Sequence, residues 1–396
     1  MNQCVILVGG KGTRLGELTK NFPKPMIEVN GRPFLLYILD YVARFGFKEI
    51  ILLASHGSEF LKDFFKDDSY KGCKIKIIVE ENPLGTGGAI VNSYEFLDET
   101  FFCLNGDSII EGNWLSILQN FDVNCDSVVA LTKTVDTKRY GSVIVENDIV
   151  KKFSEKNLNV SSKFINAGIY IFRRKIFKDY KKGFISLEKD ILPILVNNKK
   201  IKAKHIHGYF IDIGTPESLK EGINRNWNTE RKAVIFDRDG TLNEDDGYTY
   251  KTSDLKWKKG AIELIKYCND KNYYVFVATN QSGIAKDKFK ELDMHNFHKE
   301  MQEQLKISGA HIDKFYFSPY HLDATLPEYR KDSRNRKPKT GMLEQIQNEW
   351  NLSNKNMIMI GDRETDVQCA ENFQIKGFLY NGKDSLFDTF VEKIFE

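Results

Sequence analysis

Two short apolar runs in this chain each end abruptly in a loop rich in glycine or aspartate. The first, Val5–Val8, leads into Gly9-Gly10, and the second, Ala233–Phe236, leads into Asp237. A strand that runs directly into such a loop is typical of the first strand of an open α/β sheet, where ligands bind at the carboxyl ends of strands. The pattern therefore predicts two α/β domains. A length of 396 residues suits two domains as well.

Strand-like and helix-like segments alternate along both halves. The apolar runs of strand length are Cys4–Val8, Glu49–Ala54, Lys76–Val79, Phe101–Leu104, Ser127–Leu131, Ala233–Phe236, Tyr274–Ala278 and Met357–Ile360. Amphipathic stretches between them include Phe34–Phe45, Ala261–Asn269 and Met294–Ile307. This alternation predicts an α/β protein in which each domain contains a doubly wound, mostly parallel sheet. The polar stretch Asn224–Lys232 marks the expected boundary, giving domains 1–228 and 229–396.

The charge balance and the apolar runs exclude two broad classes of function. Lys and Arg number 58 against 55 Asp and Glu, a net charge of +3, whereas nucleic-acid binders usually carry a strong basic patch. No apolar run approaches the roughly 20 residues of a membrane-spanning helix. Isolated cysteines predict free, buried thiols in a reducing compartment; they are Cys4, Cys73, Cys103, Cys125, Cys268 and Cys369. We expect a cytoplasmic protein without nucleic-acid or membrane partners, and its oligomeric state stays open.

The loop after the first strand contains residue types that bind phosphate. Gly9, Gly10 and Gly12 allow the backbone to bend tightly and to aim N–H groups at an anion. A dinucleotide-binding fingerprint would need another glycine where Leu15 stands, and a P-loop would need Gly-Lys-Ser/Thr in place of Arg14-Leu15. On this motif alone, a plain structural turn remains an alternative.

Three further motifs in the first half favour a nucleotide site. Lys24 lies between two prolines and could neutralise a triphosphate or the charge on a phosphorus under attack. The segment Glu80–Ala89 places three glycines in four positions, which allows close backbone approach to a base or ribose. Asp107 follows the strand Phe101–Leu104, and together with Asp212 it offers the oxygen ligands that Mg²⁺ prefers.

In this order, the segments GGKGTRL, FPKPM, EENPLGTGGA, NGD and DIGTP resemble the sugar-1-phosphate nucleotidyltransferases over roughly residues 1–225. The resemblance implies that a sugar-1-phosphate oxygen attacks the α-phosphorus of a nucleoside triphosphate and releases pyrophosphate, for which positioning and charge neutralisation suffice. The implied residues are Gly9, Gly10, Gly12, Thr13, Gly85, Thr86 and Gly87 for the nucleotide, Arg14 and Lys24 for catalysis, Asp107 and Asp212 for Mg²⁺, and Glu155, Lys156, Asn166, Gly168 and Glu188 for the sugar phosphate. One departure is Val8, where many members carry alanine.

The second half begins with two aspartates directly after a strand. Asp237 and Asp239 can face one crevice if the backbone turns there, so that one attacks phosphorus and the other protonates the leaving oxygen. A calcium-binding loop is the alternative for Asp-x-Asp-Gly. It needs a bidentate glutamate at loop position twelve, where this chain has Tyr248.

Polar residues that could complete a phosphoryl-transfer site follow later strands. They are Thr279 and Asn280, which offer donors to a phosphoryl group, the cations Arg336, Lys337 and Lys339, and the carboxylate Asp362. The side chains of Asp237 and Asp362 and the carbonyl of Asp239 would then share one Mg²⁺.

These motifs resemble the haloacid-dehalogenase superfamily of phosphatases over roughly residues 232–396. The resemblance implies catalytic roles for Asp237, Asp239, Thr279 and Lys337, and substrate contacts for Asn280, Arg336 and Lys339. The segments DRDGTLN, TNQSGIAKDKF and RKPKTGM look most like heptose-bisphosphate phosphatases, and histidinol-phosphate phosphatases are close behind.

One departure from these relatives concerns zinc. They often carry Cys-x-His and Cys-x-Cys where this chain has Ser318-Pro319-Tyr320 and Ser333-Arg334-Asn335. His321 alone cannot hold the metal, so we expect no structural zinc. The loop must then be held by packing or by hydrogen bonds.

Together, the two resemblances imply a bifunctional enzyme of nucleotide-activated heptose synthesis. The second domain would remove the 7-phosphate of heptose 1,7-bisphosphate, and the first would transfer GMP from GTP to heptose 1-phosphate. The run Gly31–Phe34, the tripeptide Leu39-Asp40-Tyr41 and the segment Pro83–Ala89 look more like guanylyltransferases than thymidylyltransferases. One alternative is a mannose-1-phosphate guanylyltransferase fused to a histidinol-phosphate-like or unrelated phosphatase. Another is a regulatory protein that binds sugar nucleotides and has one inactive domain.

Overall fold

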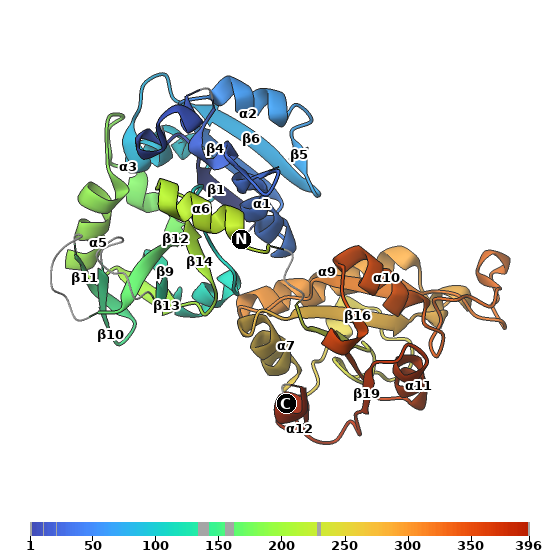
Figure 1. Ribbon diagram of the computed structural model, residues 1–396. Helices are drawn as coiled ribbons and strands as arrows, with labels where there is room; N and C mark the ends of the chain where they lie inside the picture. The colour runs from blue at the N-terminus through green and yellow to red at the C-terminus, as the bar shows by residue number, and fades with distance from the viewer. Residues whose placement is uncertain are drawn as a thin grey trace. The chain divides into compact units, whose positions relative to one another are not determined.

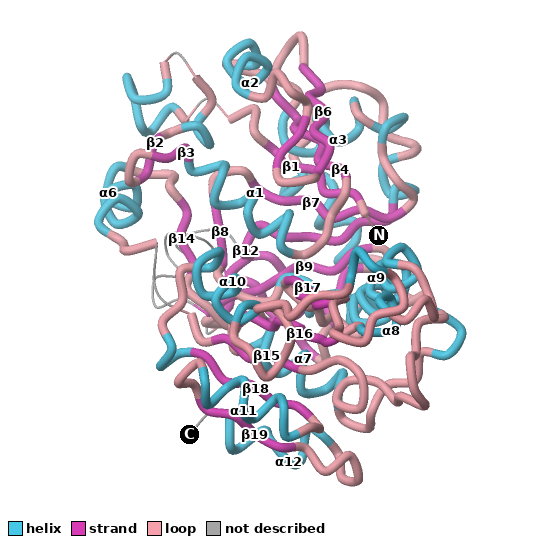
Figure 2. The backbone as a smooth tube through the Cα atoms, turned by 90° about the vertical axis from the view of Figure 1, so that its right-hand side faces the viewer, coloured by secondary structure: helices cyan, strands magenta, loops and turns pink. Residues whose placement is uncertain are grey.

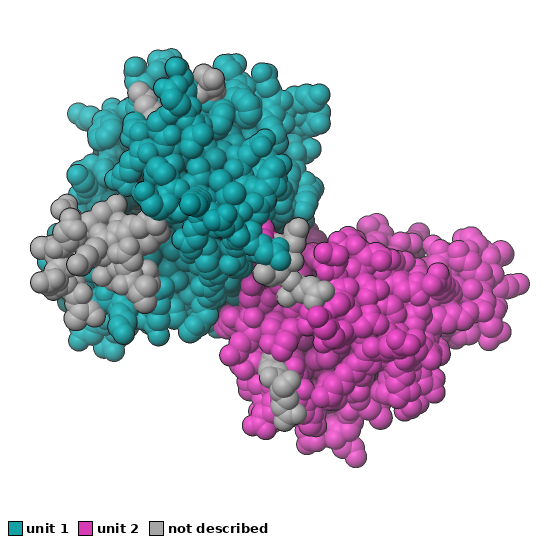
Figure 3. Space-filling view, in the orientation of Figure 1, with its two compact units in different colours: residues 1–226 teal, residues 227–396 magenta. Residues whose placement is uncertain are grey.

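The chain forms two compact units, which Figure 3 shows in different colours. The computed structural model describes residues 2–10, 12–20, 22–133, 142–154, 162–227 and 231–394. Contacts within the chain divide it into Met1–Asn226 and Trp227–Glu396. We call these the first unit and the second unit, and each is an α/β structure (Figure 1).

The first unit contains, within its described residues, a ten-stranded sheet in the order β10-β11-β13-β9-β12-β7-β1-β4-β6-β5. The strands are β1 (Gln3–Leu7), β4 (Glu49–Ala54), β5 (Ser69–Tyr70), β6 (Cys73–Val79), β7 (Thr100–Asn105), β9 (Ser127–Lys133), β10 (Ser142–Glu146), β11 (Ile149–Ser154), β12 (Phe164–Arg173) and β13 (Ile201–His205). Strands β7, β1, β4 and β6 are parallel to one another, as the alternating pattern predicts. Strand β12 enters between β7 and β9 and is antiparallel to both.

Helices and two short antiparallel ribbons surround this sheet. The helices are α1 (Phe34–Arg44), α2 (Ser58–Phe64), α3 (Gly85–Asn92), α5 (Leu192–Asn197) and α6 (Pro216–Asn224). The ribbons pair β2 (Glu28–Val29) with β3 (Arg32–Pro33), and β8 (Ser108–Ile110) with β14 (Phe210–Asp212). The second ribbon brings the segment after β14 back to the end of β7, where Asp107 lies.

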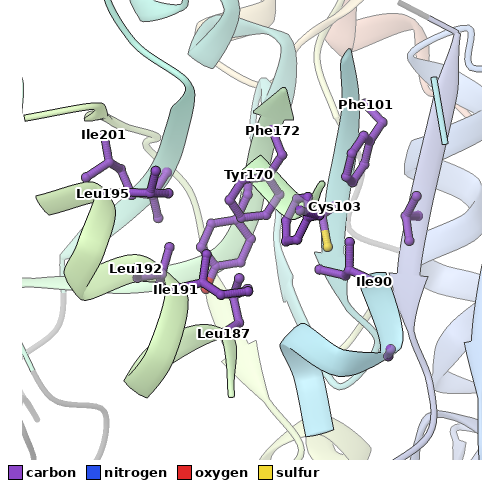
Figure 4. Packing of buried hydrophobic residues seen from close by; sticks show 14 of the residues in the cluster. Ile90, Phe101, Cys103, Tyr170, Phe172, Leu187, Ile191, Leu192, Leu195 and Ile201 are labelled. Atoms are coloured by element: carbon purple, nitrogen blue, oxygen red, sulfur yellow. The ribbon is translucent and has the colours of Figure 1, made fainter. Parts of the chain in front are cut away.

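One face of the large sheet packs against α3, α5 and the π-helical turn Leu187–Ile191. Alternate strand residues such as Cys103 and Tyr170 point to this face, and Ile90 and Leu192 cover them from the helices (Figure 4). Phe102, the neighbour of Cys103, points to the opposite face and meets Phe47 edge-on at 4.9 Å between ring centroids. A strand whose two faces are both buried has an unbroken apolar sequence, as the central strands of this sheet do.

The second unit contains, in its described part, a five-stranded parallel sheet in the order β17-β16-β15-β18-β19 (Figure 2). The strands are β15 (Ala233–Phe236), β16 (Tyr274–Asn280), β17 (Lys314–Ser318), β18 (Met357–Gly361) and β19 (Lys376–Leu379). The chain proceeds outward from β15 to β17 and then crosses to β18 on the other side of β15. In such a sheet the crevice at the reversal point lies at the ends of these two strands. Asp237 and Asp362 follow them directly.

Helices cover both faces of the second sheet, so the expected α/β class is confirmed in both units. They are α7 (Ala261–Asp270), α8 (Ser282–Ala285), α9 (Glu291–Ile307), α10 (Gly341–Trp350), α11 (Glu364–Asn372) and α12 (Leu386–Ile394). Val234 and Phe236 point toward α7, α9 and α12. Ala233 and Ile235 point toward α10 and α11. This alternation is the period of two that a strand imposes on its side chains.

The six cysteines are free and buried, as their isolated spacing predicts. Burial raises the pKa of the Cys369 thiol to about 11, and it raises that of Cys268 still further, because an apolar environment disfavours the thiolate. Among the described residues, none of the helices is both long and apolar enough to cross a membrane.

Candidate active sites

A cavity of about 580 Å³ lies at the carboxyl ends of the central strands of the first unit. Its lining residues come from the loops after β1, β4, β6 and β7 and from the segment before α5. They are Leu7, Gly9, Gly10, Lys24, Pro25, Leu53, Ser55, Glu80, Pro83, Gly85, Thr86, Ala89, Asn105, Asp107, Phe184 and Glu188. Four of the five motifs found in the first half of the sequence therefore line one cavity.

Lys24 and Asp107 meet at one end of this cavity. The Lys24 ammonium lies 2.5 Å from a carboxylate oxygen of Asp107, and the lysine is buried. Asp212 faces Ser108 across the β8–β14 ribbon, and the N–H of Ile213 donates to the carbonyl of Asp107 at 2.9 Å. The ribbon therefore places both predicted metal carboxylates beside the predicted catalytic lysine.

The segment DIGTP has a local structural reason as well. Thr215 caps α6, since its hydroxyl accepts from the N–H of Ser218, and Pro216 occupies the first turn, where its missing N–H costs nothing. Gly214 lies so close to its surroundings that a Cβ there would be 2.4 Å from Asp212 Oδ1 and 3.2 Å from Lys24 Nζ. A larger residue at position 214 would therefore force the Asp212 carboxylate to move.

The glycine-rich loop after β1 divides into two parts. Gly9 and Gly10 line the cavity. Gly12 has a positive φ of 62° and packs against Thr19, whose hydroxyl donates to the Gly12 carbonyl at 3.2 Å. Thr13 and Arg14, predicted to hold and activate the triphosphate, begin a 3₁₀ turn and are exposed to solvent.

The glycines of the second loop form the start of α3, and only part of the loop reaches the cavity. Gly85 and Thr86 line it. Gly87 packs against Ile185, whose carbonyl accepts from the N–H groups of Gly87 and Gly88 at 2.9 and 3.0 Å. A Cβ at Gly88 would lie 2.4 Å from the carbonyl oxygen of Gly183. The structure thus accounts for Gly87 and Gly88 by close packing of segment 183–185 and not by contact with the cavity.

The predicted sugar contacts within the described residues are Glu188, Asn166 and Gly168, of which the last two do not line the cavity. Glu188 lines the cavity, and Thr86 donates to its carboxylate at 3.0 Å. Asn166 lies at an irregularity in β12, where it donates to the Tyr170 hydroxyl at 2.5 Å and accepts from the N–H of Gly168 at 2.9 Å. Gly168 has a φ of 72°, which favours glycine. Glu155 and Lys156, the remaining predicted sugar-phosphate contacts, lie outside the described residues.

Glu80 is a cavity residue to which the sequence analysis gave no role. It is largely buried, and one carboxylate oxygen accepts from the N–H of Leu84 at 3.0 Å. Burial raises the pKa of Glu80, which this hydrogen bond opposes. A carboxylate at the end of a strand, directly before a glycine-rich loop, was the available signal.

The run Gly31–Phe34, which suggested guanylyltransferases, lies outside the lining of the cavity. Arg32 forms an ion pair with Asp40 at 2.7 Å and donates to the Tyr70 hydroxyl at 2.7 Å. Lys71 also pairs with Asp40 at 2.7 Å. Neither Arg32 nor Asp40 lines the cavity, so their role here is to join α1 to the β5–β6 hairpin.

In the second unit, three carboxylates and a lysine meet at the reversal point of the sheet. Lys337 is buried and lies 2.5 Å from both Asp237 and Asp366. Ligand atoms of Asp237, Asp362 and Asp366 all lie within 4.8 Å of one another. Asp366 stands in the first turn of α11, four positions after Asp362, and the sequence analysis did not include it in the metal site.

The charges in this cluster perturb one another. Burial raises the pKa of Asp237 to about 7, and the nearby Lys337 ammonium opposes this rise. Burial also raises the pKa of Asp362, and the charge of Asp366 adds to the effect. Crowded carboxylates with raised pKa values favour the binding of a cation, and an all-oxygen set suits Mg²⁺ or Ca²⁺.

The other predicted residues of the second unit differ in what they contact, and some of them hold neighbouring parts of the chain in place. Thr279 is buried at the end of β16. Asn280 donates to the carbonyl of Lys337 at 3.1 Å and accepts from its N–H at 3.0 Å, so it fixes the lysine main chain. Arg336 is half-buried and donates to the carbonyl of Tyr320 at 3.1 Å. Lys339 forms an ion pair with Asp332, which lies in the loop between β17 and α10.

Hydrogen bonds hold the loop of residues 319–339, in which the sequence predicts no structural zinc. The guanidinium of Arg330 donates through Nε and Nη2 to the carbonyl of Ala324, at 2.9 and 2.7 Å. The N–H groups of Thr325 and Leu326 donate to the carbonyl of Ala285 at 2.9 and 3.0 Å. The Ser333 hydroxyl accepts from the N–H of Asn335 at 3.2 Å. These residues do not form the thiolate–imidazole set that tetrahedral zinc requires.

A buried histidine behind the second site predicts acid sensitivity. Burial and the positive charges of Arg238 and His295 hold the pKa of His298 well below its usual value. Because the unfolded chain takes up this proton near pH 6.5 and the folded chain does not, stability is full above that pH and falls below it. Between pH 7.5 and 5.5, the free energy of unfolding should drop by roughly 1 kcal/mol from this residue.

The measurement is urea unfolding at both pH values, followed by hydrogen exchange in peptides of the second unit. His298→Gln should lose this share of the acid effect, whereas His295→Gln, at an exposed position, should keep it. An identical pH dependence in His298→Gln and the parent chain would contradict the assignment.

Comparisons with known proteins identify relatives of both halves of the chain. A family model described as nucleotidyl transferase matches residues 3–228, and one described as HAD-hydrolase-like matches residues 334–385. The chain belongs to the nucleotidyl transferase family, and its second half is a HAD-like hydrolase. Members of both groups generally use divalent metal ions, which suits the carboxylate sets of the two units.

Individual relatives of this nucleotidyl transferase–HAD chain match one half each. The first half is 40% identical over 219 residues to the D-glycero-alpha-D-manno-heptose 1-phosphate guanylyltransferase of Campylobacter jejuni, covering 54% of this chain and 96% of the relative. The second half is 37% identical over 164 residues to the D-glycero-beta-D-manno-heptose-1,7-bisphosphate 7-phosphatase of Rhodopseudomonas palustris, covering 41% of this chain and 90% of the relative.

A solved structure also matches the first half of the chain. HddC from Yersinia pseudotuberculosis is 34% identical and has a TM-score of 0.51, with 56% of this chain and 98% of that chain covered. The same protein has been solved in complex with GMP-PN.

Proposed function

We propose that this chain is a bifunctional enzyme that makes a GDP-heptose from heptose 1,7-bisphosphate and GTP. Residues 229–396 remove the 7-phosphate, and residues 1–228 transfer GMP to the remaining 1-phosphate. The observation that carries the proposal is that each half has a relative named for a heptose phosphate. The product of one named reaction has the phosphate that the other needs.

In the phosphatase half, Asp237 is the proposed nucleophile. Its carboxylate oxygen attacks phosphorus while the bond from phosphorus to the sugar oxygen breaks, and Asp239 gives a proton to that oxygen. Water then attacks the aspartyl phosphate, Asp239 takes a proton from the water, and inorganic phosphate leaves. Lys337 stabilises the charge on the phosphoryl oxygens, since it lies buried beside the nucleophile, and the buried Thr279 offers its hydroxyl as a second donor.

In the transferase half, Lys24 neutralises charge on the α-phosphate while the sugar-phosphate oxygen attacks phosphorus and pyrophosphate departs. Arg14 and the N–H groups of the Gly9-Gly10 loop hold the triphosphate. Glu188 lines the cavity and offers acceptors to the sugar hydroxyls. We place the sugar beside Glu188 and the base beside Glu80.

The proposed metal is Mg²⁺ in both halves. Asp107 and Asp212 would hold it in the first, and Asp237, Asp362 and the carbonyl of Asp239 would hold it in the second, with Asp366 close by. Both sets contain only oxygen ligands, which Mg²⁺ prefers. When bound, the ion neutralises phosphate charge.

The names of the two relatives differ in one respect that the test must include. The guanylyltransferase is named for the alpha anomer and the phosphatase for the beta anomer. If one chain performs both steps in sequence, its two sites must accept the same anomer at carbon 1.

The experiment is a phosphorus NMR time course with the full chain, Mg²⁺, an equal mixture of GTP, ATP, CTP and UTP, and either anomer of heptose 1,7-bisphosphate. We expect inorganic phosphate first, followed by pyrophosphate and the diester signal of a GDP-sugar, with one anomer only. Phosphate without nucleotide consumption for both anomers would overturn the transferase assignment, and mannose 1-phosphate would be the next substrate to test. No phosphate release would overturn the phosphatase assignment.

Glu80 predicts the base preference of the transferase half. A carboxylate can accept from both the N1–H and the N2–H of guanine, whereas an amide offers one acceptor and one donor. Glu80→Gln should therefore lower kcat/KM for GTP by about 10- to 100-fold and improve the relative use of UTP. The assay is pyrophosphate release with each nucleotide.

The matched control is Glu81→Gln, because Glu81 is the exposed neighbour of Glu80. This variant should keep the base preference of the parent chain. An unchanged ratio of GTP to UTP in Glu80→Gln would remove Glu80 from base recognition.

A further inference from the structure

Arg238, the residue between the two aspartates of the second site, is fully buried. Its guanidinium donates through Nε and Nη2 to the two carboxylate oxygens of Asp239, at 2.9 and 2.8 Å. Nη2 also donates to the carbonyl of Thr249 at 2.8 Å, and Nη1 lies 3.2 Å from Nε2 of His298. The ring of Phe297 lies 4.7 Å from the guanidinium carbon. Fixed partners on several sides therefore hold this cation in one orientation.

Gln281 completes the arrangement and connects it to the phosphoryl-binding side. Its amide nitrogen donates to Asp239 Oδ2 at 2.7 Å and to the Thr279 hydroxyl oxygen at 2.9 Å. Its amide oxygen accepts from Arg238 Nη2 at 3.2 Å. Asn243 donates to the other oxygen of Asp239 at 3.1 Å. Because the Thr279 oxygen accepts from Gln281, its own hydrogen is free to donate to a phosphoryl oxygen.

A bidentate contact fixes the plane of a carboxylate as well as its position, which a single hydrogen bond does not. A buried ion pair contributes little to stability compared with a well-packed apolar pair, so stability alone does not explain this one. Its carboxylate is the group that must reach the leaving oxygen. Small displacements of a proton donor of this kind cost large factors in rate.

We propose that Arg238 and Gln281 are positioning residues of the phosphatase. Arg238 sets the plane of the Asp239 carboxylate, and Gln281 holds Asp239 and the Thr279 hydroxyl in register with each other. This inference rests on the proposed function, in which Asp239 gives its proton to the sugar oxygen as that oxygen departs with the electron pair of its bond to phosphorus.

The nature of the leaving group distinguishes this role from a structural one. A sugar alkoxide needs a proton as it leaves, whereas p-nitrophenolate is stable without one. In the full chain, Arg238→Lys keeps a cation but loses the bidentate geometry. It should lower kcat/KM for heptose 1,7-bisphosphate by about 10- to 100-fold, because kcat/KM covers only the steps up to departure of the leaving group. It should change kcat/KM for p-nitrophenyl phosphate less than about threefold, whereas hydrolysis of the aspartyl phosphate, in which Asp239 takes a proton from water, is common to both esters and affects only kcat.

Gln281→Met should lower kcat for both esters, because it releases the Thr279 hydroxyl as well as Asp239. It also carries the test if Arg238→Lys does not fold, as judged by circular dichroism; equal kcat values in Gln281→Met and the parent chain would then overturn the proposal. Arg334→Lys, at an exposed arginine of the same unit, is the matched control. Equal losses on both esters in a folded Arg238→Lys, or no loss on either, would also overturn it.

Asp239→Asn separates this proposal from the function on which it rests. If that variant lowers kcat/KM for the sugar ester alone and Arg238→Lys does not, only the positioning role fails. If Asp239→Asn lowers kcat/KM for both esters equally, or the parent chain hydrolyses neither, the proposed phosphatase mechanism itself fails.

Discussion

Asp237→Asn is expected to abolish phosphate release while leaving pyrophosphate release from supplied heptose 1-phosphate and GTP intact. The amide cannot attack phosphorus, so the aspartyl phosphate does not form, and the loss should be at least about 10⁴-fold in kcat. Asn also removes the negative charge that Lys337 contacts at 2.5 Å. The measurement is parallel assays of phosphate and pyrophosphate on the same preparation.

The control for this substitution is Asp246→Asn. Asp246 lies in the same loop region and is exposed, so the variant should keep both activities. Residual phosphatase activity of Asp237→Asn above a few per cent would mean that another group is the nucleophile. Loss of both activities would contradict the assignment of the two reactions to separate sites.

Asp107→Ala is expected to have the reverse effect. It removes one of two carboxylates proposed to hold Mg²⁺ beside the phosphates and leaves the buried Lys24 without its partner at 2.5 Å. Transferase kcat should fall by about 10³-fold, which is the scale for removing one group that stabilises developing charge. Phosphate release from heptose 1,7-bisphosphate should not change.

Asp98→Ala supplies the matched control, because Asp98 is exposed and lies before β7, while Asp107 lies after it. Partial recovery of Asp107→Ala at high Mg²⁺ would support the metal role. A variant as active as the parent chain at low Mg²⁺ would refute it.

The sequence was most informative where both faces of a strand are buried. β4 and β15 begin and end at the expected residues, because parallel strands between two layers of helices are uniformly apolar. β12 was not predicted, although it is ten residues long. Its Asn166-Ala167-Gly168 segment interrupts the apolar run and was interpreted as a binding motif. Nothing in a local pattern indicates that a strand far along the chain enters the sheet antiparallel between β7 and β9.

In the two sites, the sequence predicted the functional residue types but not the residues that they contact. Motif order indicated Lys24, Asp107 and Asp212, and the structure brings them together. Motif order could not show that Asn280 holds the main chain of Lys337, since the two residues are far apart in sequence and meet only in the folded protein. Glycines were a further difficulty, because Gly87 is explained by contact with Ile185, on a segment about a hundred positions later.

The six buried thiols allow the two halves to be monitored independently. Cys4, Cys73, Cys103 and Cys125 belong to the first unit, and Cys268 and Cys369 belong to the second. A maleimide reacts with a thiolate at the surface, so each of these side chains becomes modifiable only when its surroundings open. The mass added to peptides of each unit therefore measures its opening, and a nucleotide or a sugar bisphosphate that protects one set of thiols reveals which half it binds.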